Sequence, residues 1–238
     1  MTPIDAPSPN FEPRKTVPDM IVLHYTGMPT GEAALARLCD PASKVSSHYL
    51  VEEDGRVFRL VAEERRAWHA GLSSWKGETD INGRSVGIEI VNPGHEFGYR
   101  AFPEAQIAAV IELLTDIRTR WSVENGYIIG HSDVAPDRKD DPGELFPWKR
   151  LAEAGHGLWA EPPAAPGAPL GEGEEGAGVF ALQAGFTRLG YDCAPSGRFD
   201  AHTTAVVTAF QRHWRPGKVD GVADGETRAR LIALLRAA

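Results

Sequence analysis

Cysteine is scarce in this chain. Its 238 residues contain two, Cys39 and Cys193, far apart in sequence. Two isolated cysteines provide neither a disulfide framework nor the paired Cys-x-x-Cys ligands of a zinc knuckle. We therefore expect both to be small buried thiols without a chemical role.

Long apolar runs are also missing. No run reaches the roughly 18 residues that a membrane-spanning helix needs. The N-terminal stretch MTPIDAPSPNFEPRK lacks the basic start and apolar core of a secretory signal. We expect a cytoplasmic protein with no membrane span, while a periplasmic or extracellular location stays open if a leader has been removed.

Positive charge is in deficit, and a net charge of −8 argues against nonspecific binding to nucleic acid. One stretch, residues 161–178 (EPPAAPGAPLGEGEEGAG), has four prolines, five glycines and no basic residue. Such a stretch buries too little apolar area to offset the entropy of ordering it. We expect an extended linker, semi-rigid at its proline end and flexible at its glycine end. It separates a domain at 1–160 from a smaller one at 179–238.

The larger domain alternates strand and helix patterns. Short apolar runs predict buried strands, and the repeat of apolar residues every three to four positions predicts helices. An Asp54-Gly55 pair predicts the turn of a hairpin. Together these patterns predict a mixed α/β domain with a central sheet flanked by helices. The expected strands are 20–25, 85–91 and 126–131, the hairpin is 47–61, and the helices are 32–39 and 103–121.

Residues 130–143 (GHSDVAPDRKDDPG) concentrate titratable groups in a run that we expect to be too interrupted by proline for a helix. His131 opens this loop at the end of one expected strand, and His24 ends another. Zinc binds histidine nitrogen and carboxylate oxygen, and catalytic sites leave a fourth position for water. A hydrogen-bonded core histidine is the plainer interpretation of either residue alone. Spacing does not choose the third ligand among Asp133, Asp137, Asp140 and Asp141.

Glu89 lies between two isoleucines in an expected strand, so alternation places it on the face opposite to theirs. On a solvent face it would be an ordinary polar residue. On a pocket floor it would be a desolvated carboxylate with a raised pKa, suited to act as a general base. Lys139 lies two residues before Asp141, so in an extended loop the two side chains point the same way; the alternative is a solvated surface lysine.

Five motifs of residues 18–150, taken in order, resemble the zinc-dependent N-acetylmuramoyl-L-alanine amidases of the type 2 amidase family. Bacteriophage T7 lysozyme and the peptidoglycan recognition proteins share that fold. In one departure, Ser47 stands where some branches have a catalytic tyrosine, which leaves the base role to Glu89. The motifs are VLHYTGM, SSHYLVEEDGRVFRLV, RAWHAG, INGRSVGIEIVNPG and IIGHSDVAPDRKDDPG. The resemblance implies that the zinc ligands are His24, His131 and Asp141, that the catalytic pair is Glu89 and Lys139, and that Trp68, His69 and Asn82 lie near the substrate cleft.

The C-terminal stretch has its own resemblance, to a small all-α, three-helix peptidoglycan-binding domain. A generic helical bundle is the alternative, because the apolar positions would be core in either case. The amidase and the wall-binding domain imply the same ligand. The matching positions are Leu182-Gln183, Leu189-Gly190-Tyr191, Gly197, Phe199-Asp200, Thr204, Phe210-Gln211, Asp220-Gly221 and Thr227.

We expect a monomer, and the two resemblances imply that it binds peptidoglycan or muropeptide fragments. The enzyme would hydrolyse the amide between N-acetylmuramic acid, or its 1,6-anhydro form, and L-alanine of the stem peptide, in wall recycling or turnover. A noncatalytic recognition protein, a lysis amidase and a zinc hydrolase acting on small peptides are the alternatives. A chain ending near Pro162 is expected to fold and to cleave soluble muropeptides, but to bind insoluble wall less well.

Overall fold

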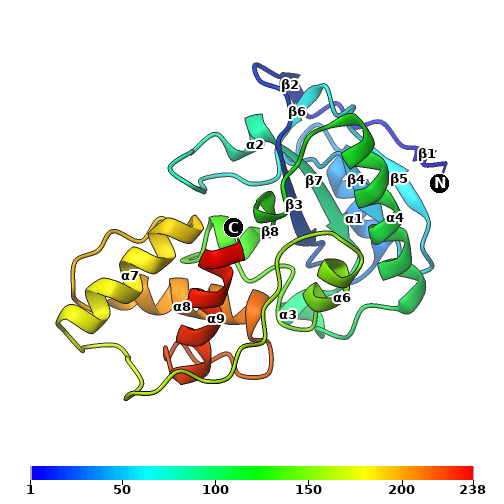
Figure 1. Ribbon diagram of the computed structural model, residues 1–238. Helices are drawn as coiled ribbons and strands as arrows, with labels where there is room; N and C mark the ends of the chain where they lie inside the picture. Colours follow the sequence, from blue (N-terminus) through cyan, green and yellow to red (C-terminus); the bar gives the residue numbers. More distant parts are fainter. Residues whose placement is uncertain (1, 238) are drawn as a thin grey trace.

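A six-stranded, mostly parallel sheet forms the centre of the N-terminal part in the computed structural model, which describes residues 2–237 (Figure 1). Strands β3, β4, β7 and β8 run parallel, and β5 is antiparallel to β4. In the order in which they lie side by side, the strands are β1 (Ile4–Asp5), β5 (Val57–Arg59), β4 (Tyr49–Val51), β7 (Ser85–Ile90), β3 (Met20–Tyr25) and β8 (Ile128–Gly130).

Two long helices cover opposite faces of this sheet. Helix α4 (Glu104–Arg120) packs its apolar side on the face that carries Ile88. Helix α1 (Gly31–Cys39) packs on the other face, against Leu50, and begins at Thr30, whose side chain accepts a hydrogen bond from the N–H of Ala33. With both faces covered, the central strands are buried and almost entirely apolar, as the sequence predicted. The expected α/β class is confirmed.

Shorter elements complete this part of the chain, and the small strands among them were not foreseen. Strands β2 and β6 form a separate two-stranded ribbon. The expectation that 130–143 contains no helix is wrong for its first turn, because the chain is helical from His131 to Val134 and Pro136 lies beyond that end. These elements are β2 (Phe11–Pro13), β6 (Arg65–Ala67), α2 (Ile81–Arg84), α3 (Gly94–Phe97), η1 (Asn125–Tyr127), α5 (His131–Val134) and α6 (Trp148–Glu153).

Three helices form the C-terminal domain, which lies beside the sheet domain in Figure 1. They are α7 (Ala177–Leu189), α8 (Ala201–Trp214) and α9 (Gly225–Ala237). The proline- and glycine-rich stretch before them pairs with this domain, because Leu170 forms a two-way backbone bridge with Ala223. Cys193 is buried here, whereas Cys39 in the sheet domain is only half-buried.

The two domains share one hydrophobic core. Its buried members come from the sheet domain (Trp75 and Val134 among them) and from all three C-terminal helices (Phe186, Phe210 and Leu231). Cutting the chain near Pro162 would expose this surface to water. We therefore expect a chain ending near Pro162 to lose stability, and its ability to fold stays a prediction.

Candidate active site

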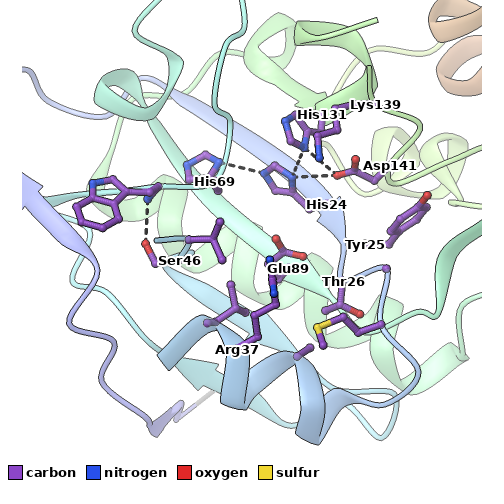
Figure 2. Close-up of a pocket in the computed structure, with 16 residues that line it drawn as sticks. His24, Tyr25, Thr26, Arg37, Ser46, His69, Glu89, His131, Lys139 and Asp141 are labelled. Carbon is purple, nitrogen blue, oxygen red and sulfur yellow. Dashed lines mark hydrogen bonds and ion pairs between the residues drawn. The ribbon is translucent and has the colours of Figure 1, made fainter. Parts of the chain in front are cut away.

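A pocket of about 300 Å³ opens at the carboxyl ends of the parallel strands (Figure 2). This edge is where open α/β sheets bind their ligands. His24 is near the end of β3, and its register partner on β7 is Glu89, so the two side chains share a face. Lys139 and Asp141 come from the loop that follows α5. The sheet thus brings together residues that lie more than a hundred positions apart in the sequence.

Three donor atoms converge in this pocket. The Nδ1 atom of His24 lies 3.0 Å from Nδ1 of His131 and 3.0 Å from Oδ2 of Asp141. The third side of the triangle, from His131 Nδ1 to Asp141 Oδ2, is 3.1 Å. All three residues are buried. Donors held about 2.1 Å from a tetrahedral ion lie roughly 3.4 Å apart, so the three atoms can hold a metal ion.

The orientation of His131 is fixed by the chain segment just after β6. Its Nε2 atom lies 3.0 Å from the carbonyl oxygen of Ala70. A carbonyl only accepts, so Nε2 carries the proton and Nδ1 has the free lone pair. Asn82 anchors the segment by accepting hydrogen bonds from the N–H groups of His69 and Ala70. Such outer contacts are typical of metal-binding histidines.

His24 is fixed by a second chain of hydrogen bonds. The hydroxyl of Ser85 donates to the carbonyl of Ile81, so its oxygen accepts from Nε2–H of His69 at 3.2 Å. Burial, followed by the neighbouring histidines, lowers the pKa of His69 well below its usual value, so the ring is neutral. Its Nδ1 atom then accepts from Nε2–H of His24 at 3.0 Å. The lone pair of His24 is left on Nδ1, facing the other two donors.

Three lone pairs therefore meet in a buried space, an arrangement that is unfavourable without a cation between them. Asp141 contributes the negatively charged oxygen of the set, beside two neutral imidazole nitrogens. The donor set therefore suits a divalent ion. Two imidazole nitrogens and one carboxylate oxygen form a catalytic type of set.

The other two predicted residues face the same pocket. Burial, with a smaller contribution from Asp141, raises the pKa of Glu89 well above its usual value, while Lys139 opposes this shift. Glu89 and Lys139 line the pocket, and no hydrogen bond or ion pair to another residue within 2–237 holds either charged group. Both groups are free to contact a bound molecule.

Trp68 and His69 also line the pocket, whereas Asn82 is buried beneath it. Among the lining residues that were not predicted, two have titratable side chains, Tyr25 and the exposed Arg37. Tyr25 follows His24 on its strand, and the hydroxyl lies 3.1 Å from Nδ1 of His95. Neither residue lies in a pattern that distinguishes it from an ordinary strand-end aromatic residue or surface cation.

The hydrogen-bond chain through His69 gives a testable expectation. Replacing His69 with alanine leaves Nε2 of His24 without its acceptor, so either ring nitrogen can take the proton. We expect metal affinity to fall by about 10–100-fold, the usual cost of losing an outer partner. Competition with a chromophoric chelator measures this. Unchanged affinity in His69→Ala would show that the chain does not set the protonation of His24.

Comparisons with known families agree with both resemblances. Residues 14–144 match the family described as N-acetylmuramoyl-L-alanine amidase, and residues 175–231 match one described as a putative peptidoglycan binding domain. The N-acetylmuramoyl-L-alanine amidase AmiD of Escherichia coli K12 is 39% identical over 236 residues, which cover 91% of this chain and 82% of AmiD. The 1,6-anhydro-N-acetylmuramyl-L-alanine amidase AmpD of the same organism is 33% identical over 164 residues, 61% of this chain and 87% of AmpD.

Solved structures extend the similarity to both domains. AmiD in complex with anhydro-N-acetylmuramic acid-L-Ala-D-gamma-Glu-L-Lys superposes with a TM-score of 0.80 at 38% identity, covering 94% of this chain and 91% of that one. AmpDH3 of Pseudomonas aeruginosa in complex with anhydromuramic pentapeptide gives 0.78 at 32% identity, covering 94% of each chain. With its amidase match over residues 14–144 and this likeness along nearly its whole length, the chain belongs to the N-acetylmuramoyl-L-alanine amidase family.

Proposed function

We propose that this protein is a zinc-dependent amidase that hydrolyses the bond between N-acetylmuramic acid, or its 1,6-anhydro form, and L-alanine of peptidoglycan stem peptides. The observation that carries the proposal is one pocket holding a buried His24–His131–Asp141 group beside two free charged groups, Glu89 and Lys139. A noncatalytic recognition protein needs a binding pocket, but it does not need a metal-binding group beside a free carboxylate and a free ammonium. The role fits the recycling or turnover of bacterial cell wall.

The zinc ligands would be His24, His131 and Asp141, through the three atoms that already converge. Bound zinc supplies Lewis-acid activation of water and of the scissile carbonyl. Glu89 faces the pocket with a pKa raised by burial, so it can accept the proton of the attacking water and deliver it to the leaving alanine nitrogen. The ammonium of Lys139, which lines the same pocket, would stabilise the negative charge that develops on the carbonyl oxygen.

Substrate contacts beyond this centre are assigned to the lining residues. Trp68 and His69 both line the pocket and would offer the substrate an indole and an imidazole ring. Asn82 would act indirectly, because it lies under the segment that carries both residues and holds their backbone. Among residues 2–237 no serine or cysteine side chain lines the pocket beside Glu89 and Lys139 except Ser46, whose oxygen accepts from the N–H of Trp68. Direct attack by water needs no such nucleophile.

We assign the catalytic domain to residues 1–160, the connecting segment to 161–178 and a peptidoglycan-binding domain to 179–238. The ligands would be peptidoglycan or its muropeptide fragments, bound by a monomer. Within residues 2–237, no helix combines the length and the apolar character needed to cross a membrane.

Incubation of the purified protein with anhydro-muropeptide tests the proposal. We expect release of a free stem peptide with a new N-terminal L-alanine, loss of activity after metal removal and its return with zinc. Parallel assays on intact sacculi separate a recycling enzyme from one that acts on assembled wall. Tight binding of muropeptide without cleavage, in a protein with zinc bound, would support the noncatalytic recognition protein instead.

A further inference from the structure

The loop 130–143 has three aspartates besides Asp141, and all three contact the C-terminal domain. Two of them are exposed aspartates that form ion pairs at the surface, and surface ion pairs contribute little to stability. Asp133 differs, because it is buried. The contacts are Asp133 with Tyr191 and His213, Asp137 with His202, and Asp140 with Arg212.

Among residues 2–237, every hydrogen bond to the Asp133 carboxylate comes either from the C-terminal domain or from the backbone beside His131. Its Oδ1 accepts from the hydroxyl of Tyr191 at 2.5 Å. Its Oδ2 accepts from Nδ1–H of His213 at 2.7 Å and from the N–H of Gly130 at 2.8 Å. A carboxylate that is 1% exposed depends on such partners. Gly130 immediately precedes His131, so this carboxylate joins the C-terminal domain to a predicted zinc ligand.

The same part of the C-terminal domain, around Gly190 and Tyr191, also packs on the segment 70–76, which orients His131. Trp75 is buried edge-to-face against Tyr191, with ring centres 5.1 Å apart. The N–H of Lys76 donates to the carbonyl of Gly190 at 2.7 Å. A Cβ atom on Gly190 would lie 2.5 Å from the Trp75 ring, so the backbone approaches closely here. This segment begins at Ala70, whose carbonyl accepts from His131.

We propose that Tyr191 is a positioning residue for the metal site, and that the C-terminal domain is a structural part of the catalytic centre as well as a wall-binding domain. Tyr191 contacts both segments that determine where His131 lies: its hydroxyl bonds Asp133, and its ring packs on Trp75. The inference rests on the proposed zinc function.

Two matched substitutions in the full-length chain test the idea. Tyr191→Phe removes only the hydroxyl and keeps the ring. Tyr49→Phe is the control, because Tyr49 also donates a buried hydrogen bond to a carboxylate, Glu63, at 2.7 Å, on the face of the sheet opposite to Glu89. We expect both variants to lose thermal stability, but only Tyr191→Phe to lose zinc affinity, by about 10-fold, the lower end of the range for outer partners.

A spectroscopic readout separates positioning from general destabilisation. In the cobalt-substituted protein, the ligand-field bands should change in Tyr191→Phe and match the wild type in Tyr49→Phe. With saturating zinc, kcat should fall in Tyr191→Phe while KM stays unchanged. Wild-type affinity and bands in a folded Tyr191→Phe protein, or equal losses in both variants, would overturn the proposal.

An experiment on the wild type covers the case in which Tyr191→Phe does not fold. Coupling is reciprocal, so if docking of the C-terminal domain strengthens zinc binding, zinc must strengthen docking. Hydrogen exchange at the interdomain amide of Lys76 and in the segment around Tyr191 should slow when zinc is added. Protection confined to the donor residues would overturn the inference but leave the zinc assignment intact. A wild type that binds no zinc would remove both.

Discussion

Replacing Asp141 with alanine is expected to abolish zinc binding, whereas replacing its neighbour Asp140 should leave it intact. Oδ2 of Asp141 lies within 3.1 Å of both histidine donors in a buried site. Its loss removes one of three ligands and the only negative charge of the donor set. The fall in affinity should therefore exceed the roughly 100-fold that loss of an outer partner can cost. His24→Ala and His131→Ala should behave in the same way.

Asp140 is the matched control for this prediction. It is the adjacent residue of the same type, but its carboxylate is half-exposed and pairs with Arg212 at 2.9 Å. Metal content after dialysis, measured by atomic emission for each variant, gives the answer. Zinc retained by Asp141→Ala and lost from Asp140→Ala would mean that the register of the loop is wrong, and full occupancy in His131→Ala would remove the whole assignment.

The sequence was sufficient to predict the strands that present His24 and Glu89. Their apolar runs are buried on both faces of the sheet, so the sequence pattern is strong. The alternation around Glu89 is confirmed, because Ile88 and Ile90 lie on the face that α4 covers. Two histidines at strand ends also indicated a metal site. The third ligand could not be chosen by spacing, because four aspartates occupy one irregular loop; the family resemblance chose Asp141, and the structure places that residue beside both histidines.

Contacts between segments distant in sequence could not be predicted in this way. Ser85 opens a strand and looks like any small polar residue, yet it orients the ring that fixes His24. Asp133 looks like a solvated loop residue, but it is buried because Tyr191 and His213 reach it from another domain. No periodic sequence pattern reveals either role, because each depends on how two folded elements pack against each other.

The second large effect is expected at Glu89. Alanine at this position should keep the fold and the zinc, because the three donors do not depend on it, but should lower turnover by about 10²–10⁴-fold, the usual range for general acid–base catalysis. Lys139→Ala should cost about 10²–10³-fold, as for loss of one oxyanion donor. Glu96→Ala, which removes an exposed carboxylate outside the pocket, is the control and should match the wild type.

The pH dependence assigns the base among these variants. The pKa of Glu89 is raised mainly by burial, and a base must be deprotonated to act. In the wild type, kcat/KM should therefore fall as the pH drops through this raised pKa, whereas a carboxylate at its usual pKa would stay active to lower pH. Lys139→Ala keeps Glu89 and should keep an acid limb, at a higher pH because the nearby positive charge lowers the Glu89 pKa in the wild type. The residual activity of Glu89→Ala should lack that limb. An unchanged acid limb in Glu89→Ala would assign the base to another group.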